Sequence, residues 1–432
     1  MIALALDGQR NAALVQYETC REILARELNL EPASATTALY TDIRGGEFTS
    51  YSDTLDAEGS AQAPGPAPFK GLQFFDLDDA GLFFGREALT ERVVGRLTSG
   101  ETFLAVIGAS GSGKSSLVRA GVAATLQTEN LPGSGAWAVD LITPGANPLL
   151  RLARRFADDA DIIALIDAMR PDPETLLRTL AAQTSPADKG KRRALIVDQF
   201  EELFTLCHDP AQRRAFVVNL LAAANAPNPI AVVIALRADF YHHCARFEGL
   251  RQALEAHQVY IGAMTSAELR RAIERPARRL DWSFEPGLVD LILKDVNASA
   301  NRPAEPGALP LLSHALLETW KRRRGRMLTL AGYAEVGGVQ GAIAQSAESV
   351  YRTLPPHEQR IARRVFLRLT AFGQLDETET TLITRRRATL KEIAALPDDP
   401  EAIQRVLDAL TAARLVTVQR NAVEVAHEAL IR

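Results

Sequence analysis

Apolar runs alternate with segments of helical spacing through the middle of the chain. Between residues 68 and 264, several short runs rich in apolar and β-branched residues are separated by segments whose apolar positions recur every three or four residues. Continuous apolar runs between helices are typical of a parallel sheet that is buried on both faces. The expected strands are 103–108, 136–142, 194–198, 230–237 and 259–264, and the expected helices include 115–126, 147–157, 173–183 and 211–224. This pattern predicts an α/β fold.

The pattern changes after Thr265. Helical spacing without strand-like runs continues to about Tyr351, which predicts a helical domain over 265–351. Further helices are expected at 356–371, 388–395 and 399–413, before two short strands joined near Asn421. Three helices followed by a β-hairpin are the outline of a winged helix, which we expect over 352–432.

The first part of the chain has two segments with helical spacing, 10–28 and 34–43. Gly8, Ala13, Tyr17 and Cys20 have the spacing of the second helix of a tetratricopeptide-type (TPR-like) repeat, although any amphipathic helical hairpin would also fit. Residues 45–67 are rich in Gly, Ser, Ala and Pro and have no apolar period, as expected of a linker. We therefore separate a helical segment, 1–44, from an α/β domain, 68–264.

Composition narrows the class of protein. A chain of 432 residues is too long for one ordinary core, so several domains are expected. The net charge of -4 argues against a general nucleic-acid or membrane-surface coat. Three cysteines without CxxC spacing suit a reducing compartment. With no recognisable signal peptide and no run near 18 apolar residues, we expect a cytoplasmic protein without a membrane partner.

A phosphate-binding loop follows the first expected strand. The segment from Gly108 to Ser115 reads GASGSGKS and matches GxxxxGK[ST] between a strand and a helix. Glycines such as Gly111 and Gly113 let the backbone N–H groups face phosphates, and the following helix adds its dipole. We expect Lys114 to bridge the β- and γ-phosphates, Ser115 to bind Mg²⁺, and the neighbouring Ser116 to belong to the same site. The expected ligands are ATP or ADP with Mg²⁺.

Charged residues follow two other expected strands. Asp198 comes after the apolar run ALIV, where a second Mg²⁺ ligand is expected. The next residue is Gln199, where many hydrolytic relatives have the Glu that activates water. Glu201 and Glu202 follow, and either could polarise water, or could instead only cap a helix or pair with an arginine. Arg237 ends the strand at 230–237, where it could sense the γ-phosphate.

A series of segments resembles one family. In chain order these are PFKGLQFF, FFGRE, FLAVIGASGSGKSSLVRAG, LIVDQFEELF, LRADFY, GALPLLSHALLETW, GGVQGAIA and VEVAHEALIR. Together they resemble the novel STAND NTPases, a bacterial branch of the signal-transduction P-loop ATPases, over 68–432. The string DGQRNAALVQYETCREILARELNLEPASATTALYTDI resembles the end of the bacterial transcriptional activator domain. We therefore expect Met1 to begin inside a domain.

The resemblance implies further roles. Pro310, in Ala308-Leu309-Pro310-Leu311, would pack on adenine, although it could equally only start a helix. His427, the one residue of the family's Met-His-Asp motif that is kept here, would touch the β-phosphate of ADP, although it could be an ordinary residue at a strand end. Phe84 and Arg86 would flank the adenine. The class also implies a closed ADP form that opens and self-associates with ATP, and C-terminal sensor repeats in the parent protein.

The leading hypothesis is a STAND-type ATP/ADP switch in signal transduction or transcription regulation that hydrolyses ATP slowly to reset. A continuously cycling AAA-like remodelling ATPase is one alternative. A winged-helix DNA-binding regulator with nucleotide as its allosteric ligand is another. Basic residues at 321–326 and 384–387 would suit DNA, but Asp399, Glu401 and Asp408 make the third C-terminal helix partly acidic, so we do not expect direct DNA binding.

Overall fold

The computed structural model describes most of the chain, in two compact units. The described residues are 10–23, 32, 34–45, 65–128, 137–182, 191–227, 229–296, 308–372, 383–386, 388–395, 397–413, 415–419 and 422–425. One unit contains Met1–Gly65 with Arg323–Met327, and the other contains Pro66–Arg322 with Leu328–Arg432. No helix in these described ranges is long and apolar enough to span a bilayer.

The described residues of the first unit form two helices, α2 (Arg10–Ile23) and α3 (Ser34–Gly45). They meet through aromatic rings, because Tyr17 stacks on Tyr40 with ring centroids 4.1 Å apart. The Tyr17 hydroxyl lies 3.1 Å from Thr37 Oγ1, and the Tyr40 hydroxyl donates to Glu18 at 2.9 Å. Both predicted helices are present, and residues 24–28 of the first lie outside the described residues. The TPR-like character of this pair stays a prediction.

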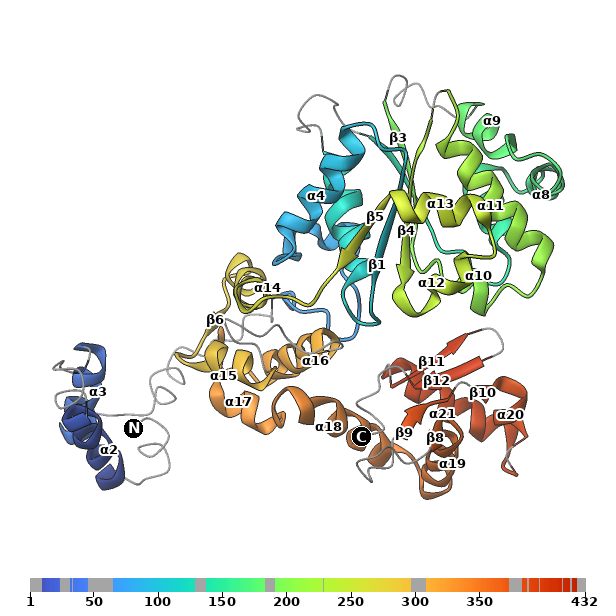
Figure 1. Ribbon diagram of the computed structural model, residues 1–432. Coiled ribbons are helices and arrows are strands. Elements are labelled where there is room, and N and C mark those ends of the chain that lie inside the picture. Colours follow the sequence, from blue (N-terminus) through green and yellow to red (C-terminus); the bar gives the residue numbers. More distant parts are fainter. Residues whose placement is uncertain are drawn as a thin grey trace. The chain divides into compact units, whose positions relative to one another are not determined.

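Five parallel strands form the sheet of the second unit (Figure 1), which confirms the predicted α/β fold. Their order is β2-β3-β4-β1-β5. All four neighbouring pairs run parallel. The strands are β1 (Phe103–Gly108), β2 (Ala138–Ile142), β3 (Arg193–Val197), β4 (Ala231–Arg237) and β5 (Gln258–Ile261). Each overlaps a predicted strand, with ends that differ by no more than about three residues.

Helices cover both faces of this sheet, as the continuous apolar strands require. Leu104 and Val106 of β1 pack on one face with α4 (Glu87–Thr98). Phe103, Ala105 and Ile107 pack on the other face with α7 (Pro148–Phe156), α9 (Thr175–Ala182) and α11 (Pro210–Ala224). The helices before β2 are η2 (Leu77–Leu82), α4 (Glu87–Thr98), α5 (Lys114–Ser116), η3 (Leu117–Ala123) and α6 (Ala124–Leu126). The helices after β2 are α7 (Pro148–Phe156), α8 (Ile162–Met169), α9 (Thr175–Ala182), α10 (Glu202–Thr205), α11 (Pro210–Ala224), η5 (Ala238–Phe240), α12 (Tyr241–Cys244) and α13 (Glu248–Ala256).

Helices dominate after β5, around a core that includes Trp282, Leu288 and Leu312. The elements are α14 (Ser266–Arg279), β6 (Ser283–Phe284), α15 (Leu288–Asp295), α16 (Ala308–Lys321), β7 (Met327–Leu328), α17 (Leu330–Glu335) and α18 (Gly338–Thr353). The expectation of no strands was wrong for β6 and β7. Each has only two residues, too few for a strand period to show in the sequence.

The last part combines helices and short strands. Its elements are α19 (Pro356–Arg368), β8 (Thr370–Phe372), β9 (Ile383–Arg385), β10 (Ala388–Thr389), α20 (Leu390–Ala394), α21 (Pro400–Ala412), β11 (Val416–Gln419) and β12 (Ala422–Val425). The predicted helices and hairpin are present, with β11 and β12 antiparallel. The helix predicted from 388 starts later because Ala388 and Thr389 pair with β12, and Thr389 then caps α20.

Candidate nucleotide-binding site

The phosphate loop joins β1 to α5. Gly108 ends β1 and Lys114 starts α5. Gly111 and Gly113 have φ values of 73° and 89°, in the left-handed region that residues with a Cβ rarely adopt. The glycines of the sequence motif are therefore required by this backbone, which curls back before the helix begins.

Lys114 is held inside the loop. Its side chain is largely buried, and Nζ donates to the carbonyl oxygens of Gly108 at 3.0 Å and Ala109 at 2.8 Å. Burial lowers the pKa of Lys114, and the negative charge of Glu201 opposes that shift. Among the described residues, no carboxylate is hydrogen-bonded to this ammonium, which suits a group that binds phosphate oxygens.

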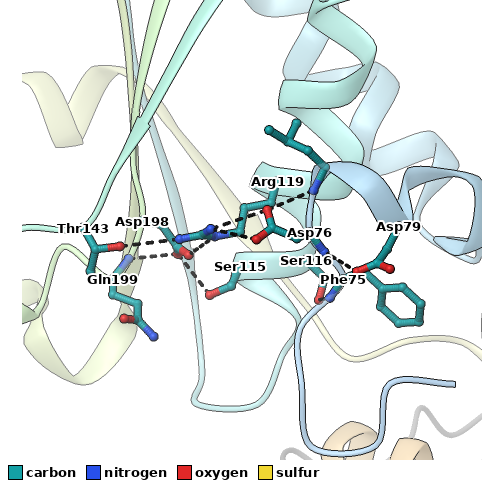
Figure 2. Close-up of polar contacts among 10 residues, drawn as sticks. Phe75, Asp76, Asp79, Ser115, Ser116, Arg119, Thr143, Asp198 and Gln199 are labelled. Carbon is teal, nitrogen blue, oxygen red and sulfur yellow. Dashed lines mark hydrogen bonds and ion pairs between the residues drawn. The ribbon is translucent and has the colours of Figure 1, made fainter. Parts of the chain in front are cut away.

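Ser115 and Asp198 lie together, as the sequence predicted. Ser115 Oγ donates to Asp198 Oδ1 at 3.0 Å (Figure 2), and Asp198 is only 1% exposed. The backbone N–H of Gln199 donates to the same oxygen at 2.9 Å, and Gln199 has a left-handed φ of 52°. The register explains the proximity, because β3 and β1 both flank β4 and their carboxyl ends lie at one edge of the sheet.

Two residues of this cluster were given no role from the sequence. Arg119 Nε donates to Asp198 Oδ2 at 2.8 Å, and Arg119 Nη1 lies 3.3 Å from Asp76 Oδ2 (Figure 2). The position of Arg119, five residues after the loop lysine, was a usable signal because it lies in the helix that leaves the loop. Asp76 gave no such signal, since it lies far from the phosphate loop in the sequence.

Glu201, Glu202 and Arg237 lie beside the loop. The backbone N–H of Arg237 donates to Glu201 Oε2 at 3.3 Å, and burial raises the pKa of Glu201. The N–H of Gly145 donates to Glu202 Oε2 at 3.0 Å, and burial raises the pKa of Glu202 to about 7. The guanidinium of Arg237 pairs with Asp239 at 2.6 Å, a partner that the sequence analysis missed.

The FFGRE segment packs beside the loop. Gly85 has φ 90°, and a Cβ there would lie 2.5 Å from the carbonyl oxygen of Glu268. Arg86 is buried, and its Nη2 donates to the carbonyl oxygens of Gly262 at 2.7 Å and Ser112 at 3.4 Å. Burial lowers the pKa of Arg86. Arg86 therefore ties the phosphate loop to the segment that follows β5.

A cavity of about 420 Å³ brings most of the predicted site together. This volume is within the range of small-molecule sites. The predicted residues that line it are Phe84, Arg86, Gly111, Gly113, Lys114, Ser115, Ser116, Glu201, Glu202, Arg237 and Pro310. Pro310 reaches it from α16. Among the predicted site residues that the structure describes, Gly108 and Asp198 are not in the lining, although Asp198 contacts Ser115. His427 lies outside the described residues.

The fold and the loop define the class of protein. A parallel sheet with GxxxxGKS after β1 and a buried aspartate after β3 is that of a P-loop NTPase. Residues 68–432 match the family described as Novel STAND NTPase 1, and the chain belongs to that family. Residues 1–44 match the bacterial transcriptional activator domain. Both matches confirm the resemblances drawn from the sequence.

Solved structures with a similar fold have low sequence identity. The ORC1 protein of Aeropyrum pernix in complex with DNA is 16% identical, with a TM-score of 0.45 over 82% of this chain and 93% of that chain. The ORC2 protein of Aeropyrum pernix is 17% identical, with a TM-score of 0.42 over 79% and 88%. A Walker-type ATPase of Pyrococcus abyssi is 13% identical, with a TM-score of 0.40 over 83% and 96%. No curated protein matches this chain.

Proposed function

We propose that this chain is an ATP/ADP-dependent switch that hydrolyses ATP slowly to reset and acts in signal transduction or transcription regulation. The observation that carries the proposal is the lining of the cavity, where Lys114 and Arg237 of the sheet-containing part and Pro310 of α16 line one space. A nucleotide in that space would contact both parts of the chain. It would bias their arrangement by its differential affinity for the two arrangements.

The phosphate end of the cavity would hold the charged part of the nucleotide. Lys114 and the loop N–H groups bind phosphate oxygens in this proposal. The Ser115 hydroxyl and the Asp198 carboxylate, 3.0 Å apart, are hard oxygen ligands of the kind that Mg²⁺ prefers. When bound, Mg²⁺ neutralises part of the charge on the β- and γ-phosphates.

Glu201 is our candidate for polarising water. Lys114 and Arg237 both act on its charge, so its carboxylate lies close to the two residues expected beside the γ-phosphate. Glu202 is less suitable because the Gly145 N–H donates to its carboxylate at 3.0 Å, a shorter hydrogen bond than the 3.3 Å one from the Arg237 N–H to Glu201. Gln199 cannot act as a base, which favours slow hydrolysis. Arg237 would sense the γ-phosphate, a role in which it exchanges Asp239 for a phosphate oxygen.

The remaining roles rest on family membership. Pro310, Phe84 and Arg86 would hold the adenine, and His427 would contact ADP. In the same proposal the part after 352 is a winged helix, the protein acts in the cytoplasm, and ATP promotes self-association. A transcriptional output is supported by the match of residues 1–44 to an activator domain.

The test is to identify the nucleotide that copurifies with the protein by chromatography after denaturation, and then to follow turnover and mass with ATP. For the wild type we expect tightly held ADP, few turnovers and an increase in mass with ATP. For Lys114→Ala we expect no retained ADP, no turnover and no increase in mass. Sustained multiple turnover without a partner would instead favour a remodelling ATPase. Unchanged ADP retention in His427→Ala would remove the latch role of that residue.

A further inference from the structure

Arg119 lies at the centre of the charged cluster. It belongs to η3, a π-helix over Leu117–Ala123 that follows the loop helix directly. A π-helix is rare and frequently marks a functional site. The Arg119 side chain is 13% exposed and extends between Asp198 and Asp76 (Figure 2). A largely buried arginine that is shared by two carboxylates from different parts of the chain needs an explanation beyond packing.

Both carboxylate oxygens of Asp198 have partners among these residues. Oδ1 accepts from Ser115 Oγ and from the N–H of Gln199, and Oδ2 accepts from Arg119 Nε. Asp198 is buried, so its negative charge needs a counter-charge. Arg119 supplies it. A divalent cation bound by Ser115 and Asp198 would bring a second positive group to the same carboxylate, and the two would repel each other.

We propose that Arg119 is an internal counter-ion with which a divalent cation must compete for Asp198. We also propose that Arg119 couples cation binding to the segment 74–76, through its ion pair with Asp76. The inference rests on the proposed function, because that function makes Asp198 a cation ligand. Coupling between two ligands is reciprocal. If Arg119 weakens cation binding, the cation weakens the Arg119–Asp198 pair by the same factor.

The segment 74–76 is held by contacts to α5 and η3. The backbone N–H of Phe75 donates to Ser116 Oγ at 3.1 Å, and the guanidinium of Arg119 lies 4.6 Å from the ring centre of Phe74. Asp76 caps η2 and pairs with Arg119. When a cation weakens the hold of Asp198 on Arg119, Asp76 becomes the stronger partner. The segment is then held more tightly.

The experiment is a titration of the full chain with Mn²⁺ in the presence of ADP, followed by electron paramagnetic resonance. Arg119→Gln should bind Mn²⁺ at least about fivefold more tightly than the wild type, because the competing charge is gone. Asp76→Asn should bind it more weakly, because Arg119 then pairs with Asp198 alone. Arg96→Gln is the matched control, since Arg96 of α4 pairs with Glu101 in the loop before β1. It should not change the affinity.

The change in melting temperature on adding Mn²⁺ gives a second readout that a purely structural role would not move. Arg119→Gln should lower the melting temperature without Mn²⁺ and recover more than the wild type when Mn²⁺ and ADP are added. In the wild type, amide exchange at 74–76 should slow on adding Mn²⁺ to the ADP complex. This slowing should be absent from Arg119→Gln.

The outcomes separate the two proposals. Mn²⁺ binding that is lost in Asp198→Asn but unchanged or weaker in Arg119→Gln overturns the counter-ion role and leaves the proposed function intact. Tighter binding in Asp76→Asn overturns the link to the segment 74–76. Mn²⁺ binding that is untouched in Asp198→Asn contradicts the proposed cation site and overturns this inference with it.

Discussion

The two walls of the cavity are built on different physical principles. On the phosphate wall, Lys114, Ser115 and their neighbours are fixed by hydrogen bonds to the loop and to Asp198. The wall from α16 is mostly apolar, with Leu309, Pro310, Leu312, Ser313 and Leu316. The phosphate wall therefore offers charged groups and directed hydrogen bonds to a ligand, whereas the α16 wall offers an apolar surface of fixed shape.

Because the walls differ in this way, we expect the phosphate wall to set the affinity for nucleotide and the α16 wall to set how the protein responds to it. Charge-assisted hydrogen bonds contribute most of the affinity for a polyphosphate. An apolar wall contributes less, but in the proposed switch it is the part that would move relative to the sheet and so make one nucleotide state differ from another. We expect substitutions on the phosphate wall to abolish binding, and those on the α16 wall to change selectivity and coupling.

The largest effect is expected from Lys114→Ala. Loss of an ammonium that makes several charged hydrogen bonds should weaken ATP and ADP binding by about 4 kcal/mol, or roughly a thousandfold. The fold should not suffer, because burial already disfavours the charged lysine. Calorimetric titration measures the affinity, with the half-exposed Lys321→Ala as the control. A loss below about tenfold would contradict the assignment of this wall.

The phosphate wall was also the easier one to predict. Its loop ligands lie within eight consecutive residues, and Asp198 follows a buried strand, so local spacing was sufficient. The partners Gly145 and Asp76 were not predictable, because a hydrogen bond between distant segments leaves no trace in the local pattern. Asp239 is only two residues from Arg237, so its pairing was a local signal that the sequence analysis missed. The π-helix at Leu117–Ala123 was missed because its apolar spacing resembles that of an α-helix.

A smaller effect, on the free energy of unfolding, is expected at Gly85, where the FFGRE segment packs on α14. Gly85 packs on the first turn of α14, and Gly85→Ala would bring a Cβ 2.5 Å from the Glu268 carbonyl oxygen at φ 90°. Strain and overlap together should cost about 3 kcal/mol of unfolding free energy. Urea denaturation measures it. Gly95→Ala, in α4 where no atom lies within 4 Å of the added Cβ, should be neutral or slightly stabilising.

Glu202, on the phosphate wall, should make the free energy of unfolding of the protein depend on pH. Its pKa is about 7 in the folded protein against an ordinary 4.5, so the folded state favours the protonated form. The resulting stabilisation is complete below about pH 4.5 and is lost as pH rises through 7. Glu202→Gln stays neutral and can still accept the Gly145 N–H. It should therefore be more stable than the wild type by about 2 kcal/mol at pH 8, and equal to it near pH 4.

Melting temperatures across this pH range give the comparison, with Glu335→Gln on the exposed side of α17 as the control. A variant advantage that is constant with pH would show that Glu202 acts through packing alone.

The smallest effect is expected on the apolar wall. Pro310 lines the cavity from the first turn of α16, and Pro310→Ala removes contact area without removing a charge or a hydrogen bond. ATP affinity should fall by about 1 kcal/mol, or roughly fivefold. Because the proposed contact of Pro310 is with the adenine base, GTP affinity should fall less, and the ratio of ATP to GTP affinity should decrease. Lys114→Ala should lower both affinities equally, since it acts on the phosphates. Equal losses for the two nucleotides in Pro310→Ala would mean that this wall also acts on the phosphates, and the division between the walls would fail.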